Sequence, residues 1–107
     1  MKIPFDKAEQ QKATAEFQVI LEANRAAPLS PPELTDHYLE HGEPEMAYEA
    51  FMLDLFFDGL ILPAPVCAAL LDIGIRLGVN DDPIFFDDSW ERIERLCRRC
   101  LEAEQFA

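Results

Sequence analysis

The sequence predicts an all-α fold, a compact bundle of about five helices with short connections. Apolar residues recur at helical spacing in five segments, and prolines or glycines stand between these segments. No alternation of apolar and polar residues is long enough to require a sheet. The 107 residues, half of them apolar, fit a single domain (1–107) with one modest core.

The first predicted helix covers residues 5–27, which are rich in Ala, Glu, Gln and Lys. Its apolar stripe consists of Ala13, Phe17, Ile20 and Leu21. Prolines at positions 28, 31 and 32 end this helix, because proline lacks a backbone N–H and restricts the residue before it.

The core of the domain, residues 30–79, is predicted to contain three helices. The first of them begins with a capping box at Ser30 and runs to about residue 41. Leu34 and either Tyr38 or Leu39 are expected to face inward. Gly42 ends this helix, since glycine adopts the left-handed conformation that many helix stops need.

The other two core helices are predicted at residues 44–58 and from the Pro63-Ala64-Pro65 segment to Gly78. The 44–58 helix is expected at the centre because it has two apolar stripes: Met46, Ala50, Leu53 and Phe57, and beside them Ala47, Phe51 and Leu55. Gly59 ends it. Gly78 followed by Val79 predicts a Schellman stop, and Gly74 indicates close packing against a neighbour.

Residues 84–107 form a predicted C-terminal arm with a last helix at 89–105. Its inward stripe is Trp90, Ile93, Cys97, Cys100 and Leu101, and Glu and Arg side chains share the opposite, self-paired face. The preceding Ile84-Phe85-Phe86 fits either a strand-like bridge or a helical turn.

Net charge is unevenly distributed along the chain. Its formal value is −12, with a pI of about 4.3. Residues 1–25 and 91–107 each contain four basic and four acidic residues, whereas residues 26–90 contain thirteen acidic residues and one basic residue, Arg76. The whole imbalance therefore lies in the middle of the chain.

This charge argues against nucleic acid as a direct partner, because phosphate binding needs Lys and Arg. It also argues against anionic membrane surfaces. The polar N-terminus has no apolar signal region, and no apolar run approaches the roughly 18 residues of a membrane-spanning helix. With an odd count of three cysteines, these features favour a reducing cytoplasm.

No pattern of residues predicts a catalytic, metal or cofactor site. His37 and His41 lack further ligands at zinc spacing. Cys97 and Cys100 fall on an apolar helical stripe, where small core residues are the simpler interpretation. The paired aspartates at 81–82 and 87–88 do not follow the EF-hand spacing and suit turns and helix caps better. Carboxylates are frequent, yet none is isolated in an apolar setting that would shift its pKa.

The acidic stretch 34–59 is the predicted binding surface. It contains seven carboxylates and neither Lys nor Arg. Each pair of like charges at i, i+4 costs a few tenths of a kcal/mol. Because the stretch tolerates this repulsion without a nearby cation, we expect its negative electrostatic field to serve in binding. The predicted partner-binding residues are Glu40, Glu43, Glu45, Glu49, Met52, Asp54, Phe56 and Asp58. Tyr48 and Phe85 are further candidate apolar anchors.

Residues 34–79 also resemble a known family, the MafI-type immunity proteins of bacterial polymorphic toxin systems. The matching residues are Tyr38, Leu39, His41, Gly42, Glu43, Ala47, Leu53, Leu55, Gly59, Ile61 and the segment Ile73-Gly74-Ile75-Arg76-Leu77-Gly78. The resemblance implies a non-catalytic protein that binds and blocks a cognate toxin domain made by the same bacterium. The matched residues are structural, so no toxin-contacting residue follows from it.

Two function hypotheses come from the sequence. The first is an immunity protein that neutralises a basic toxin domain, expected to be a nuclease, through an acidic helical surface. The alternative is a helical protein-interaction module, an adaptor or regulatory subunit, without a toxin partner. An enzyme is the weakest reading, because the sequence shows no convergent set of catalytic residues.

Overall fold

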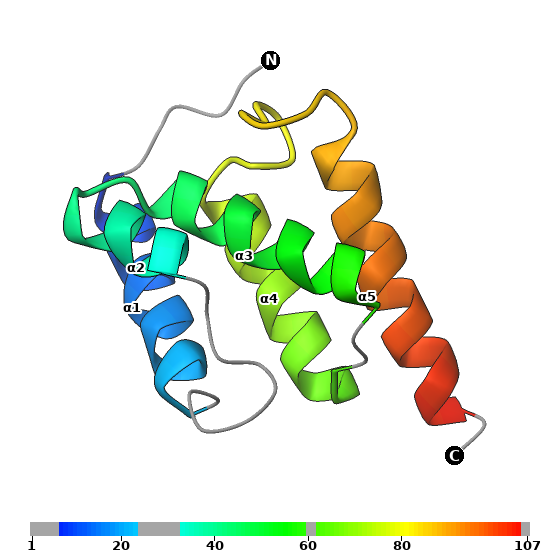
Figure 1. Ribbon diagram of the computed structural model, residues 1–107. Helices are drawn as coiled ribbons and strands as arrows, with labels where there is room; N and C mark the ends of the chain where they lie inside the picture. The colour runs from blue at the N-terminus through cyan, green and yellow to red at the C-terminus, as the bar shows by residue number, and fades with distance from the viewer. Residues whose placement is uncertain (1–6, 24–32, 60–61, 106–107) are drawn as a thin grey trace.

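The computed structural model describes residues 7–23, 33–59 and 62–105, and it confirms the all-α prediction (Figure 1). The described residues form five helices and no strand. Their bounds are α1 (Lys7–Ala23), α2 (Glu33–Glu40), α3 (Pro44–Asp58), α4 (Ala64–Arg76) and α5 (Ser89–Gln105). The radius of gyration of 13.2 Å matches the value of about 13 Å expected for a folded domain of this length.

The helices form two layers. α4 packs between α1 and α5, and the α2–α3 pair lies across this row (Figure 1). α3 contacts α2, α4 and α5, and its Phe51 and Tyr48 rings meet Phe17 of α1 edge to face. The prediction that the 44–58 helix is central is therefore confirmed. None of the described helices is both long enough and apolar enough to cross a membrane.

Helix α2 differs from its prediction. The capping residue Ser30 lies outside the described residues, as do residues 5–6 and 24–27 of the predicted first helix. The prediction that Leu34 faces inward is wrong, since 47% of it is exposed and the buried residue is Thr35. Tyr38 and Leu39 are both half-buried against the core. α2 is short and packs mainly on α3, so it covers the core with one narrow side.

Two other predicted core residues are exposed. Phe57, in the last turn of α3, is 60% exposed, and Leu101 of α5 is 43% exposed. In α5, Leu96 is buried instead of Leu101. The inward stripe of this helix is therefore Ile93, Leu96, Cys97 and Cys100. This i, i+3, i+4, i+7 pattern is the ordinary apolar face of a helix.

The predicted helix stops are confirmed. Gly42, Gly59 and Gly78 have positive φ values of 71°, 68° and 82°. After α4, the N–H of Val79 donates to the Gly74 carbonyl and the N–H of Gly78 donates to the Ile75 carbonyl, each at 3.0 Å. That pair of bonds is the Schellman motif, and Val79, the residue after Gly78, is buried as is common in this motif.

Gly74 permits a close approach inside the core. A Cβ atom at this position would overlap the Tyr48 hydroxyl and lie 2.7 Å from the Trp90 ring. The Tyr48 hydroxyl donates a hydrogen bond of 2.8 Å to the Leu70 carbonyl, so the tyrosine cannot move aside without losing that bond. The close packing predicted from this glycine is therefore confirmed.

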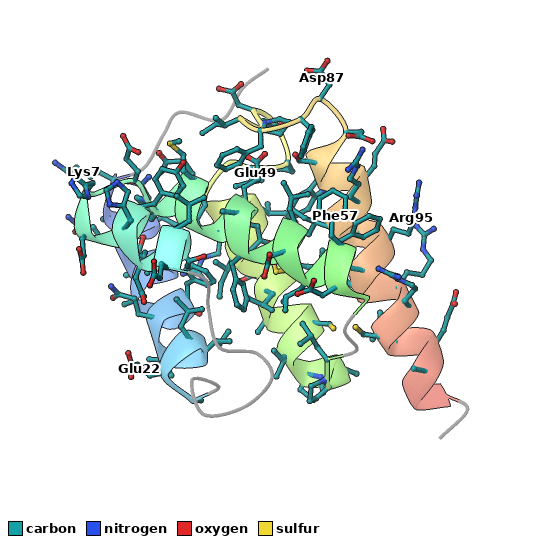
Figure 2. All side chains as sticks on the ribbon, in the orientation of Figure 1. Lys7, Glu22, Glu49, Phe57, Asp87 and Arg95 are labelled. Carbon is teal, nitrogen blue, oxygen red and sulfur yellow. The ribbon has the colours of Figure 1, made fainter. Side chains whose placement is uncertain are left out.

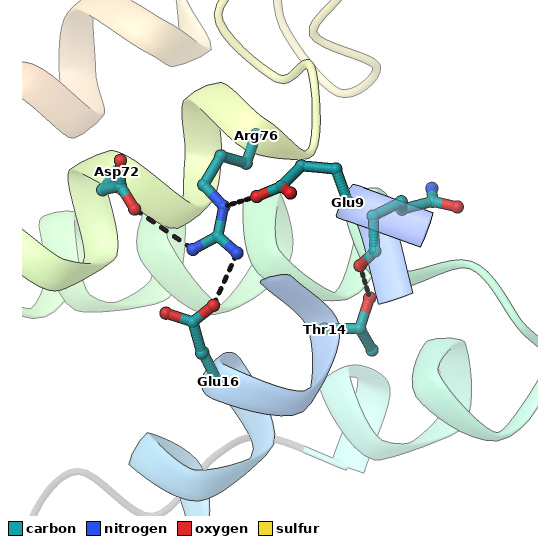
Figure 3. Close-up of polar contacts among 6 residues, drawn as sticks. Glu9, Thr14, Glu16, Asp72 and Arg76 are labelled. Atoms are coloured by element: carbon teal, nitrogen blue, oxygen red, sulfur yellow. Dashed lines mark hydrogen bonds and ion pairs between the residues drawn. The ribbon is translucent and has the colours of Figure 1, made fainter. Parts of the chain in front are cut away.

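Arg76 joins α4 to α1. Its guanidinium contacts three carboxylates, those of Glu9 at 2.6 Å, Asp72 at 3.2 Å, and Glu16 (Figure 3). The hydrogen bond from Arg76 lowers the pKa of Glu16 below its ordinary value. The only basic residue of the acidic middle is thus used to hold two helices together rather than to neutralise the surface.

Replacing Arg76 with Gln should lower the urea midpoint of unfolding at pH 7. A lowered carboxyl pKa adds stability that is present above the unfolded-state pKa and is lost as pH falls through the folded-state pKa. The difference from wild type should therefore shrink at pH 3. Arg98→Gln, on the exposed side of α5, is the control and should show no pH-dependent difference. An equal loss from Arg76→Gln at both pH values would contradict the ion-pair explanation.

Candidate protein-binding surface

The turn between α2 and α3 presents two of the predicted carboxylates. Glu40 and Glu43 are exposed on either side of Gly42. The N–H of Glu43 donates to the Tyr38 carbonyl at 2.9 Å, and the N–H of Gly42 donates to the Leu39 carbonyl at 3.2 Å. These bonds form a second Schellman motif, so the carboxylates stand on an ordered turn.

Asp54 and Asp58 form a second acidic site at the C-terminal end of α3. Both are exposed and lie one helical turn apart. Partial burial, and then the like charge of Asp58, raise the pKa of Asp54 above its ordinary value. A positive charge placed beside this pair would relieve the repulsion.

Glu45 does not share a face with Asp54. The two residues are nine positions apart, which at about 100° per residue places them on opposite sides of α3. Glu45 is half-buried and accepts a hydrogen bond of 3.2 Å from the Gln10 side chain of α1. The predicted carboxylates therefore form two separate groups, one at each end of α3, rather than one continuous face.

Glu49 and Met52 must be removed from the predicted surface, because both are fully buried. Figure 2 shows the Glu49 side chain directed from α3 toward the loop that precedes α5. Its carboxylate accepts hydrogen bonds from the N–H of Ile84 at 2.7 Å, the N–H of Phe85 at 2.7 Å and the Ser89 hydroxyl at 2.8 Å. Glu49 is a structural residue that holds the loop to the centre of the bundle.

The loop around Ile84-Phe85-Phe86 is neither of the structures predicted for it. Ile84 and Phe85 form a bend and Phe86 has no regular structure, so the segment is neither a strand nor a helical turn. Their backbone donors are satisfied by side chains, since the N–H of Phe86 donates to the Ser89 hydroxyl oxygen at 3.2 Å and the other two bind Glu49. Buried backbone donors need such partners wherever no regular structure supplies them.

A cluster of aromatic rings at the ends of α3 and α5 was missed by sequence reasoning. Phe57 and Phe86 are exposed, and the guanidinium of Arg92 lies over both rings, 5.3 Å and 5.0 Å from their centroids. Of the predicted apolar anchors, Tyr48 is buried, while Phe56 and Phe85 are half-buried. Only the Arg-rich spacing of the last helix hinted at the cluster.

Cys97 and Cys100 are core residues, as predicted, and Cys67 lies in the core with them. Cys67, Cys97 and Cys100 are free and fully buried. Burial raises the pKa of Cys97 to about 11, and burial likewise raises the pKa of Cys67. The N–H of Leu62 donates to the Cys100 sulfur at 3.1 Å. Thiols with raised pKa values and no access to water are poor nucleophiles.

Among the described residues, no group of three or more His, Cys, Asp or Glu side chains is placed so that it could hold a metal ion. The rings of His37 and His41 lie 4.2 Å apart, and the Nδ1–H of His41 donates to the His37 carbonyl at 2.8 Å. That bond helps to close the last turn of α2. The two histidines therefore have a structural role at the helix end.

Two surface hollows lie beside α1. The larger, of about 520 Å³, is lined by Gln18, Leu21, Glu22, Asp36, Leu39 and Glu40. The smaller, of about 310 Å³, lies between α1 and the start of α3. Amide, carboxylate and apolar side chains line the larger hollow. The smaller one is lined by amide and apolar groups together with Lys7 and Thr14, whose hydroxyl donates to the Gln10 carbonyl at 2.7 Å.

Comparison of the chain with models of protein families, with characterised proteins and with solved structures finds no match.

Replacing Glu49 with Gln should destabilise the protein by about 2 kcal/mol, since the amide nitrogen of Gln cannot accept a hydrogen bond and leaves a buried donor unpaired. Urea unfolding followed by circular dichroism measures this loss. The matched control, Glu43→Gln on the exposed turn, should change stability by less than about 0.5 kcal/mol. If both variants behaved alike, the carboxylate would not be holding the loop.

Proposed function

We propose that this protein is an immunity protein that binds a cognate bacterial toxin domain, a basic nuclease, and blocks it. The observation that carries the proposal is the set of exposed carboxylates at both ends of α3: Glu40, Glu43, Asp54 and Asp58. None of them pairs with a Lys or Arg among the described residues. The resemblance of residues 34–79 to MafI-type immunity proteins supplies the toxin as the partner.

The physical case is electrostatic complementarity. A nuclease cleft is basic because it binds phosphates, so an acidic surface is attracted to it. A net charge of −12 on 107 residues produces a long-range field that orients a cationic partner before contact. Complementary fields of this kind act mainly on the association rate.

The arrangement of the carboxylates refines this picture. They lie in two groups at the two ends of α3, and Glu40 and Glu43 of the first group precede the helix. Glu45 lies on the far side of α3 from Asp54, so no single face holds them all. A cation approaching either group meets carboxylates that form no ion pair with a Lys or Arg in the described part of the chain. Partial burial, and then the like charge of Asp58, raise the pKa of Asp54.

The alternative, a helical interaction module without a toxin partner, would use the same surface. The two functions differ in the partner's effect on the cell. Co-expression with the toxin domain encoded beside this chain's gene should restore growth and allow the two proteins to be purified together. If the toxin remains lethal and no complex is recovered, the immunity proposal fails and the interaction module becomes the better explanation.

Reversing two charges at the turn, Glu40→Lys with Glu43→Lys, should slow association with the toxin domain about tenfold at low salt. Its rate should also depend less steeply on salt, because fewer attractive charges remain to be screened. Stopped-flow association measured across a NaCl series tests both effects.

The control for this experiment is Glu94→Lys with Glu102→Lys, which makes the same change in net charge on exposed positions of α5. It should slow association less, because these positions lie outside the acidic middle of the chain. Equal effects from the two pairs would show that net charge acts without regard to position, which would contradict a role for the α2–α3 turn.

A further inference from the structure

A second surface feature has a composition opposite to that of the acidic middle. Along the seam between α3 and α5, aromatic rings alternate with arginines, and this set is called here the aromatic–arginine ridge: Phe56, Phe57, Phe86, Arg92, Arg95 and Arg99. Phe57 is 60% exposed and Phe86 is 46% exposed, and the adjoining Ile84 is 50% exposed. Figure 2 shows Phe57 over the seam and Arg95 projecting from α5.

The ridge is internally ordered. Arg92 lies over the rings of both Phe57 and Phe86, whose centroids are 6.5 Å apart, and its Nε donates to Asp88 at 3.0 Å. Arg99 lies 5.0 Å from the Phe56 centroid and donates to the Phe56 carbonyl at 3.4 Å. Rings held in place by arginines lose little side-chain entropy on binding, and Phe and Arg are enriched at protein interfaces.

The ridge contains arginines but no carboxylates, so ion pairs with its arginines must come from carboxylates outside the ridge. Arg92, Arg95 and Arg99 recur at i, i+3 and i+7, so they form one stripe on α5. The self-paired face predicted for this helix is not formed, since Arg92 alone of its arginines has an ion pair among the described residues. On the adjacent end of α3, Asp54 and Asp58 are acidic and lack a described cation.

We infer that the aromatic–arginine ridge is the contact surface of a symmetric homodimer. In it, Phe57 and Phe86 of the two copies pack around the twofold axis, and Arg95 of each copy pairs with Asp58 of the other. A twofold axis brings the same patch of both copies together, so a patch that has both arginines and aspartates beside exposed rings is complementary to itself.

Charge and size both favour a second copy at this place. Two molecules with a net charge of −12 repel each other over most orientations, and a contact that brings the arginines of one copy to the aspartates of the other lowers this repulsion. A standard interface needs about 800 Å² from each copy, which is about one eighth of the 6572 Å² surface of this chain. The neighbouring outer sides of two helices can supply an area of that order. The sequence makes no prediction of the oligomeric state. The inference does not depend on the proposed function, and a dimer that uses Asp58 leaves Glu40 and Glu43 exposed for a cationic partner.

Sedimentation velocity of the purified chain from micromolar to millimolar concentration tests the inference. Wild type should show a dimer, and Phe57→Ser should weaken dimerisation at least about tenfold, since a buried aromatic anchor is lost. The matched control is Val19→Ser on α1, another apolar residue that is 69% exposed. It should leave the dissociation constant unchanged. Circular dichroism establishes that each variant is folded.

A charge exchange tests the pairing across the axis. Arg95→Glu and Asp58→Arg should each weaken the dimer, and the double variant should recover part of the loss because the pair is restored with opposite sign. A wild-type chain that stays monomeric at 1 mM (roughly the weakest range of specific association) would overturn the inference. So would a Phe57→Ser variant whose dissociation constant equals that of Val19→Ser.

Discussion

The structure depends on one buried carboxylate. Glu49 lies on the central helix and accepts hydrogen bonds from two successive backbone N–H groups of the loop before α5 and from the Ser89 hydroxyl. A carboxylate has about four acceptor positions, and three are used here. The loop has no regular structure of its own, so these bonds determine where α5 begins relative to α3.

This anchor connects the core with the surface. The Ser89 hydroxyl oxygen accepts a hydrogen bond from the N–H of Phe86. The ring of Phe86 in turn lies beside Arg92 and the ring of Phe57. The positions of the exposed rings therefore depend on the Glu49 carboxylate, although these rings do not contact it. A binding surface whose parts are fixed before contact binds with a smaller entropic cost. The acidic groups at the two ends of α3 are a different kind of feature, because their effect is a field that reaches beyond contact.

Much of the fold was predictable because it follows from local rules. The five helices were predicted from the spacing of apolar residues. The helix stops at Gly42, Gly59 and Gly78 were predicted because glycine readily adopts the left-handed conformation. Gly74 was assigned to close packing, and the Tyr48 hydroxyl fills that space. Each of these inferences uses residues that lie within a few positions of one another.

The candidate surface was less predictable because it depends on distant residues. In the sequence, Glu49 resembles every other acid of the stretch 34–59, and its burial is decided by backbone donors some 35 residues later. Phe57 continues an apolar stripe, yet it lies in the last turn of α3 and meets Arg92 of α5 instead of the core. One signal was available, since the nine-residue spacing of Glu45 and Asp54 already places them on opposite sides of a helix.

The most direct test of this account is amide hydrogen exchange at Ile84 and Phe85 in the wild-type protein. Both amides lie in an irregular loop, where exchange is normally fast. If Glu49 holds them as described, they should be protected to nearly the same degree as the core amides of α3 and exchange mainly through global unfolding. Exchange at the rate of an open loop would contradict the central role of the Glu49 carboxylate.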